Sequence, residues 1–283
     1  MKEKYLQKVP NWYNSNEKFD VVLSDDIDGI VSTSALKYAK GWDVEYFYDF
    51  ETLYVANELY FKENKSATRV WADVSIVVQD EKTFDNHVNR VNLNDYTNPN
   101  AINPNILDDI TNENYYDKYL GSSALVIWSL YNIPLPKTEL GKMILLAIDT
   151  TFKGFYGKEQ YQRANKHFLC DVLGMEELYE VLKRHSSHEF YQLFDKYNLS
   201  TKTIVDKDGY LHTKLDLEFL SEILGIPMVL PTKQVTEWRS FDSKFTGKTY
   251  FCLKSIKDIP RLTTIAFTGK NEICYSVLKK KTK

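Results

Sequence analysis

The chain has 283 residues, of which 43% are hydrophobic, and its formal net charge at pH 7 is −3. This length and hydrophobic content allow a sizeable buried core, so we expect a globular protein with one large domain or a main domain and a smaller partner. Because the chain has no large positive charge to attract nucleic acid from a distance, an architectural DNA-binding function is disfavoured.

The sequence gives no sign of a membrane segment or of a secretory signal. Its longest apolar runs, such as residues 143–148, are far shorter than the roughly 20 residues of a membrane-spanning helix. Cys170, Cys252 and Cys274 are widely spaced, and the N-terminus lacks the apolar core of a signal peptide. We therefore expect free thiols, a cytoplasmic location and no membrane contact, while the oligomeric state is unknown.

The first part of the chain alternates between strand and helix patterns. A glycine at position 41 ends the first of the expected helices. Such alternation predicts an α/β fold with a parallel sheet flanked by helices. In chain order we expect a strand at Val21–Leu23, a helix at Gly29–Lys40, a strand at Val44–Tyr48, a helix around Leu53–Phe61 and a strand at Thr68–Ala72.

The second part of the chain begins with a segment rich in Asn, Asp and Pro, residues 88–119, which we interpret as a long surface loop. Helical patterns follow, and strand patterns dominate after about residue 200. We therefore divide the chain into a main domain at 1–200 and a smaller α+β C-terminal module at 201–283. The expected elements are helices at 122–131, 139–148 and 158–197, the last broken at Gly174, and strands at Val235–Trp238, Thr249–Leu253 and Leu262–Thr268.

Four aspartates stand at or just after the ends of apolar stretches. Asp26 and Asp28 follow the first strand, Asp73 follows a later one, and Asp149 ends the run 143–148. Carboxylates at the carboxyl edge of a parallel sheet are suitable ligands for divalent cations, with Mn²⁺ favoured and Mg²⁺ second when an imidazole is nearby. The alternative is local: Asp26 as a helix cap, Asp73 as a turn residue and Asp149 as a cap.

In order and spacing, four segments within residues 19–155 resemble the motifs of the DHH phosphoesterase superfamily. The segment Leu23–Ser32 resembles the first motif, with its DxDG core at Asp26–Gly29, and Asp73 resembles the second. The triplet Asp85-Asn86-His87 resembles the third motif and Asp149 the fourth. The superfamily includes single-strand exonucleases, small-oligonucleotide phosphodiesterases and manganese pyrophosphatases.

The resemblance implies that Asp26, Asp28, Asp73 and Asp149 coordinate metal and that His87, beside Asp85, contacts the scissile phosphate. Two positions depart from the family pattern: Ser24 replaces a His or Asp, and Asn86 replaces the first His of the triplet. Their hydroxyl and amide oxygens can coordinate hard cations but carry no charge, so the affinity expected for one of two metals is lower.

Two functions are therefore open. The favoured one is a divalent-metal-dependent phosphodiesterase or nuclease acting on a nucleotide or a short single-stranded nucleic acid. The alternative is a catalytically degenerate protein of the same fold that binds a phosphorylated ligand without turnover. Among the basic residues, Arg90 is the favoured phosphate contact; Arg69, Lys153 and Arg239 are further candidates, although scattered basic residues on a surface usually serve solubility. Aromatic residues at 46–50 are candidates for base stacking, although core packing is their commoner use.

Overall fold

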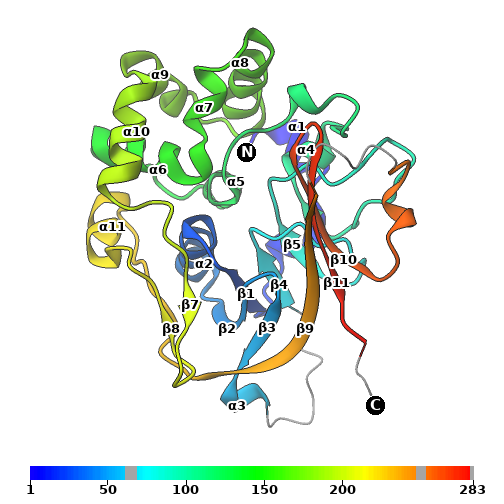
Figure 1. Ribbon diagram of the computed structural model, residues 1–283. Coiled ribbons are helices and arrows are strands. Elements are labelled where there is room, and N and C mark those ends of the chain that lie inside the picture. Colours follow the sequence, from blue (N-terminus) through cyan, green and yellow to red (C-terminus); the bar gives the residue numbers. More distant parts are fainter. Residues whose placement is uncertain (61–68, 247–252, 281–283) are drawn as a thin grey trace.

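The computed structural model describes residues 1–60, 69–246 and 253–280, and its main feature is one mixed nine-stranded sheet (Figure 1). The strand order is β10-β11-β9-β3-β2-β1-β4-β5-β6, and β7 and β8 form a separate two-stranded sheet. The strands are β1 Asp20–Ser24, β2 Asp43–Tyr48, β3 Thr52–Ala56, β4 Arg69–Ala72, β5 Lys82–Phe84, β6 Ala101–Ile102, β7 Ile204–Val205, β8 Leu211–His212, β9 Val235–Thr246, β10 Leu262–Gly269 and β11 Glu272–Leu278.

The half of the sheet from β2 to β6 is parallel, and the other half is antiparallel. The prediction of an α/β fold is confirmed, while the sheet as a whole is mixed and not purely parallel. In the central strand β1, Val21, Val22 and Leu23 are completely buried, as a strand with neighbours on both sides requires.

The prediction of a helix around Leu53–Phe61 is wrong for most of that segment. Residues Thr52–Ala56 form β3, followed by the short helix α3 at Asn57–Tyr60, and Phe61 lies outside the described residues. β3 pairs antiparallel with both β2 and β9. A short apolar run does not distinguish strand from helix by its period, so pairing with a strand 180 residues later decided the outcome.

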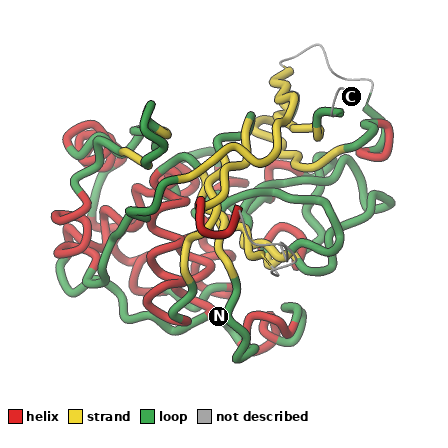
Figure 2. Tube along the Cα trace, turned by 90° about the horizontal axis from the view of Figure 1, so that it is seen from below, coloured by secondary structure: helices red, strands yellow, loops and turns green. Residues whose placement is uncertain are grey.

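The remaining predicted helices are present, and most of them lie together beside the sheet (Figures 1 and 2). Gly41 and Gly174 end their helices with φ values of 71° and 69°, which a residue without a side chain adopts at no steric cost. The α-helices are α1 Glu3–Leu6, α2 Ile27–Lys40, α4 Pro104–Leu107, α5 Ser123–Leu130, α6 Glu139–Ala147, α7 Phe152–Phe155, α8 Glu159–Lys166, α9 Glu176–Arg184, α10 Ser187–Lys196 and α11 Leu217–Leu224; a π-helix spans His167–Val172, and 3₁₀ turns span Asn11–Asn14, Tyr115–Asp117, Ile148–Thr150 and Ile256–Asp258.

The C-terminal strands, which we expected in a module of their own, extend the main sheet by the pairing of β9 with β3. The last hairpin then curls back: β10 forms bridges from Thr264 to Ile76 and from Phe267 to Val88. A second core cluster, which includes Val22, Tyr48, Trp71 and Phe241, packs inside this curl. Of the predicted strand Thr249–Leu253, residues 249–252 lie outside the described residues.

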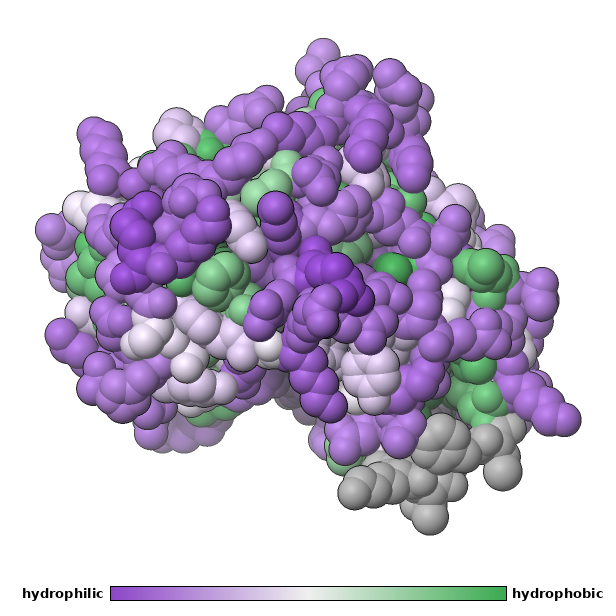
Figure 3. Space-filling view, turned by 90° about the horizontal axis from the view of Figure 1, so that it is seen from above, coloured by the Kyte–Doolittle hydropathy of each residue, from purple (hydrophilic) through white to green (hydrophobic). Residues whose placement is uncertain are grey.

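The segment 88–119 is largely irregular, as predicted, but much of it is buried. Asn103 and Asn105 are 0% and 1% exposed, so their polar side chains must find partners inside the protein. The face seen in Figure 3 is mostly hydrophilic, with scattered apolar side chains. In the described part of the chain, none of the helices combines the length and the hydrophobicity that crossing a membrane demands.

Candidate functional site

The predicted site residues of β1 and β4 meet because these strands are parallel neighbours, with Leu23 opposite Ala72. Ser24 ends β1 and Asp73 follows β4, and the Ser24 hydroxyl donates to Asp73 Oδ2 over 3.2 Å. Asp73 has a φ of 60°, which is typical of a turn residue and sharply redirects the chain after the strand. Asp73 therefore serves as a turn residue and also lies in the aspartate cluster.

Asp26 and Asp28 lie at the N-terminus of α2, immediately after β1. Asp26 is the N-cap and accepts from the Gly29 amide over 3.1 Å, which confirms the capping role. Gly29 is required here, because a Cβ on it would lie 2.2 Å from Ser24 Oγ and 2.7 Å from the Ser24 carbonyl oxygen. The glycine of the DxDG segment thus lets the helix begin directly against the strand end.

Asp28 connects this strand end to a second helix. Its Oδ2 accepts from the Ser123 amide over 2.7 Å, and its Oδ1 accepts from the Ala124 amide over 2.8 Å. These amides belong to the first turn of α5, where free N–H groups and the helix dipole favour a negative charge. The Ser123 hydroxyl also donates to Asp73 Oδ1 over 3.1 Å, so α5 supports two of the four aspartates.

Asp149 reaches the same region from the far end of α6. It lies in a 3₁₀ turn with a φ of 47°, and Thr150 beside it has a φ of 55°. Asn86 Nδ2 donates to Asp149 Oδ2 over 2.6 Å and to the Gly121 carbonyl over 2.8 Å. Asn86 therefore meets Asp149 as a hydrogen-bond donor, while its own Oδ1 is buried and has no partner in the described part of the protein.

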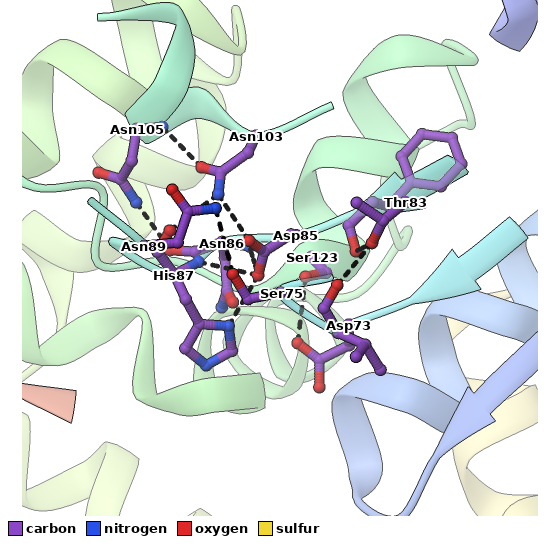
Figure 4. A network of polar contacts seen from close by, with 12 residues as sticks. Asp73, Ser75, Thr83, Asp85, Asn86, His87, Asn89, Asn103, Asn105 and Ser123 are labelled. Carbon is purple, nitrogen blue, oxygen red and sulfur yellow. Dashed lines mark hydrogen bonds and ion pairs between the residues drawn. The ribbon is translucent and has the colours of Figure 1, made fainter. Parts of the chain in front are cut away.

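The buried Asp85 and the partly exposed His87 form a pair within a network of asparagines (Figure 4). Asp85 Oδ1 lies 2.8 Å from His87 Nδ1, and Asn103 Nδ2 donates to Asp85 Oδ2 over 2.7 Å. Because a carboxylate oxygen can only accept, this geometry assigns the proton to Nδ1. Asn105 holds the same loop by donating to the Asn86 carbonyl over 2.7 Å. The network fixes the orientation of the His87 ring.

The four aspartates are close enough to affect one another's ionisation. Burial, followed by the charge of Asp149, raises the pKa of Asp28 to about 7. Burial and the charges of Asp28 and Asp26 raise the pKa of Asp73 well above its usual range. Burial also raises the pKa of Asp149, against the charges of His87 and Lys118. The cluster therefore holds more negative charge than the surrounding groups offset.

The aspartate cluster does not form a metal-holding group as it stands. Among the described residues, no three His, Cys, Asp or Glu side chains are arranged so that they could hold a metal ion. Both oxygens of Asp28 and both oxygens of Asp73 already accept hydrogen bonds from amides or hydroxyls. Lys202 Nζ lies 2.8 Å from Asp25 Oδ1 and 3.4 Å from Asp26 Oδ2.

A cavity of about 420 Å³ adjoins the cluster. Its polar wall contains Asn86, His87, Asp149 and Thr150, and two lysines, Lys118 and Lys153, add positive charge. The rest of the wall is mainly aromatic and consists of Tyr115, Tyr119, Tyr161 and Phe267 with Leu120, Gly121 and Thr268. Of the predicted site residues, Asn86, His87 and Asp149 line this cavity, as does the candidate Lys153.

Neither Arg90 nor the aromatic residues at 46–50 line this cavity. Arg90 is 5% exposed, and its guanidinium lies 3.5 Å both from the Ile110 carbonyl and from Asp109 Oδ1. Tyr46, Phe47 and Tyr48 are at most 2% exposed and belong to the core. Arg90 therefore lies in a buried part of the segment 88–119, where it contacts other residues of that segment. Tyr46, Phe47 and Tyr48 serve core packing.

Several residues of the site were not predicted from the sequence. The pair Ser122 and Ser123 before an apolar helix is a recognisable capping signal, and Ser122 does cap α5. Nothing in the local sequence distinguishes Lys118 or Lys202 from other lysines. The burial of Asn103 and Asn105 in a segment of turn-forming composition was equally hidden, because burial there depends on packing between distant segments.

Comparisons of the chain with family models, with curated proteins and with solved structures found no match.

Proposed function

We propose that this protein binds a nucleotide, or the end of a short single strand of nucleic acid, with its phosphate at Lys118, Lys153 and His87. The observation that carries the proposal is the composition of the 420 Å³ cavity, which places these cationic side chains beside an aromatic wall. The volume is within the range of small-molecule sites in proteins. Phosphate binding without turnover is the function that this geometry supports best.

Lys118 is the strongest indication of an anionic ligand. Burial lowers its pKa, and the charge of Asp149 only partly opposes this effect. Within the described residues the Lys118 ammonium forms no salt bridge and no hydrogen bond, and it lies 4.8 Å from the centre of the Tyr115 ring. A buried ammonium without an ion pair is costly, so a phosphate at this position would gain a strong charge-assisted bond.

His87 and Lys153 extend the cationic side of the cavity. Burial lowers the pKa of His87, but the hydrogen bond to Asp85 and the charge of Asp85 outweigh it, so the pKa is raised overall. A larger fraction of the imidazole is therefore protonated at neutral pH than in water. Lys153 is exposed and its ammonium lies 5.7 Å from the Tyr191 ring centre, free to turn toward an anion.

The aromatic wall supports a nucleotide in preference to inorganic phosphate. Tyr115, Tyr161 and Phe267 line the cavity together with the lysines and His87. Tyrosine and phenylalanine rings stack on any base, with gains of about 1–3 kcal/mol per base. A ligand with a phosphate and a base would use both kinds of wall at once.

The binding proposal corresponds to a DHH-like fold without a working metal centre. The aspartates receive their hydrogen bonds from amides and hydroxyls, Asn86 donates to Asp149, and Lys202 lies beside Asp26. These donors occupy carboxylate oxygens that a cation would otherwise contact, although they do not neutralise the charge of the cluster. The substitutions Ser24 and Asn86, already visible in the sequence, are consistent with this state.

One observation favours a second function, divalent-metal-dependent hydrolysis of a phosphodiester. The raised pKa values of Asp28, Asp73 and Asp149 are what uncompensated carboxylates show before a cation neutralises them. In that case Mn²⁺ or Mg²⁺ would be held by these aspartates with Asp26, and the cation would supply charge neutralisation and a water of lowered pKa. The arrangement of the described residues does not itself meet this requirement.

Calorimetric titration separates the two functions. We expect AMP or the dinucleotide pApA to bind in the presence of EDTA. Adenosine, which lacks the phosphate, should bind at least about tenfold more weakly than AMP. Lys118→Met should lower the affinity for AMP by a similar factor. Lys158→Met, at an exposed lysine outside the cavity, is the matched control. Binding of AMP that is insensitive to Lys118→Met would refute the proposed site. Mn²⁺-dependent hydrolysis of pApA that Asp73→Asn abolishes would establish the second function.

A further inference from the structure

The aspartate cluster has a cation of its own that does not line the cavity, Lys202. Lys202 Nζ lies 2.8 Å from Asp25 Oδ1 and 3.4 Å from Asp26 Oδ2. Asp26 in turn contributes to the raised pKa values of Asp28, Asp73 and Asp149. The Lys202 ammonium is therefore paired with one of the several carboxylates whose charges act on the cluster.

The chain fixes the position of Lys202 from both sides. Leu199 is 1% exposed and packs in the core, and the Thr203 amide donates to the Asp25 carbonyl over 2.5 Å. Lys202 is thus held on a short, anchored segment that leads from α10 into β7. An ammonium that is held in this way loses little conformational freedom on pairing with a carboxylate, unlike most exposed lysines.

We propose that Lys202 is a built-in counter-cation of this cluster, which supplies part of the positive charge that a divalent metal would supply and thereby disfavours metal binding. The inference rests on the metal-free form of the proposed function. Asn86 also meets the cluster through a nitrogen, since its Nδ2 donates to Asp149 Oδ2. Lys202 and Asn86 together occupy two sides of the cluster with nitrogen donors.

The charges near Lys202 agree with a neutralising role. Burial lowers its pKa, but the charge of Asp26 and the hydrogen bond to Asp25 outweigh that effect, so the pKa is raised and the ammonium stays charged. Burial raises the pKa of Asp25, and the Lys202 bond opposes it. Removing this one positive charge would leave Asp25 and Asp26 beside three further carboxylates without their ion-pair partner.

The experiment measures the affinity of the purified full chain for Mn²⁺ alone, by calorimetry and by the shift in melting temperature, at pH 7.5. Lys202→Met keeps the length of the side chain and removes its charge, and Lys202→Arg keeps the charge. We expect no Mn²⁺ response in the wild type or in Lys202→Arg, and at least about tenfold tighter Mn²⁺ binding with a rise in melting temperature in Lys202→Met. Lys196→Met, on the exposed end of α10, is the matched control and should behave as the wild type.

The outcomes for Lys202 and for the proposed function can be told apart. If Lys202→Met shows no Mn²⁺ binding and no shift in melting temperature, the inference is overturned, whether or not the wild type binds AMP. A wild type that binds Mn²⁺ as tightly as Lys202→Met overturns it too and also removes the metal-free form of the proposed function. If Lys202→Met gains Mn²⁺ binding while the wild type fails to bind any nucleotide, the inference stands and the proposed function fails. If Lys202→Met does not fold, Lys202→Gln takes its place in each comparison.

Discussion

The amide nitrogen of Asn86 lies 2.6 Å from Oδ2 of Asp149, although 62 residues separate the two in the chain. This contact joins the loop after β5 to the turn after α6 and borders the cavity. Asn86 meets Asp149 only as a hydrogen-bond donor, since the nitrogen of an amide can donate to a carboxylate but cannot coordinate a cation. The relationship is the basis of our first prediction.

Asn86→Leu removes the donor without changing the side-chain volume much. We expect the free energy of unfolding to fall by about 1–3 kcal/mol, because Asp149 keeps its buried carboxylate but loses a partner. Denaturant unfolding measures the loss. Asn94→Leu, at an exposed asparagine whose side chain makes no hydrogen bond among the described residues, should change it by less than about 0.5 kcal/mol. Equal losses for the two variants would contradict the proposed importance of the Asn86 amide.

Gly29→Ala tests the close packing of the first helix against the strand end. An added Cβ would lie 2.7 Å from the Ser24 carbonyl, which is backbone and cannot rotate away. We expect a loss of about 1–3 kcal/mol of stability, as for other overpacked sites. Combining it with Ser24→Ala removes the hydroxyl clash but not the carbonyl clash, so the double variant should recover only a small part. Full recovery would show that the backbone can shift freely there.

The aspartate cluster should make the protein less stable as pH rises toward neutrality. The folded-state pKa of Asp28, about 7, exceeds the usual value of 3.8, so between these values the folded state binds more protons than the unfolded state. Its contribution is therefore fully favourable below about pH 4 and is lost as pH rises through 7. Each unit of such a shift corresponds to about 1.4 kcal/mol. Melting curves between pH 5 and pH 8.5 measure the trend.

Asp73→Asn should weaken this pH dependence and raise stability at pH 8 by about 1 kcal/mol or more. The substitution removes one charge, and the hydroxyls of Ser24 and Ser123 can rotate to accept from the new amide. Asp208→Asn, at an exposed aspartate, is the control and should leave the pH profile unchanged. A lower stability of Asp73→Asn at every pH would mean that its hydrogen bonds outweigh its charge repulsion.

Binding of AMP should weaken between pH 6 and pH 8.5, because the imidazolium of His87 loses its proton over that range. The pKa of His87 is raised, and the lowered pKa of Lys118 acts in the same direction at the alkaline end. His87→Gln should flatten most of the profile, whereas His212→Gln, at a surface histidine paired with Asp206, should leave it as in the wild type. A profile that is flat already in the wild type would exclude His87 as a phosphate contact.

Part of this fold can be predicted from local sequence alone. The segment from Val21 to Gly41 carries a buried strand, a capping aspartate and a terminating glycine, and the structure confirms each of them. The strand β3 was not predicted in this way, because one of its two partners, β9, comes from a distant part of the chain. The same applies to the C-terminal hairpin, whose contacts with Ile76 and Val88 depend on the curl of the whole sheet.

The sequence by itself determined where the acidic residues stand, at or just after the ends of apolar stretches. Only the tertiary structure decided what those residues meet: the amides of α5 at Asp28, Asn86 at Asp149 and Lys202 at Asp26. Local spacing fixes short-range features such as caps and turns, because they depend on a few neighbouring dihedral angles. The partners of a buried charge come from segments 60 to 180 residues away, and their positions follow from how the helices and the sheet pack.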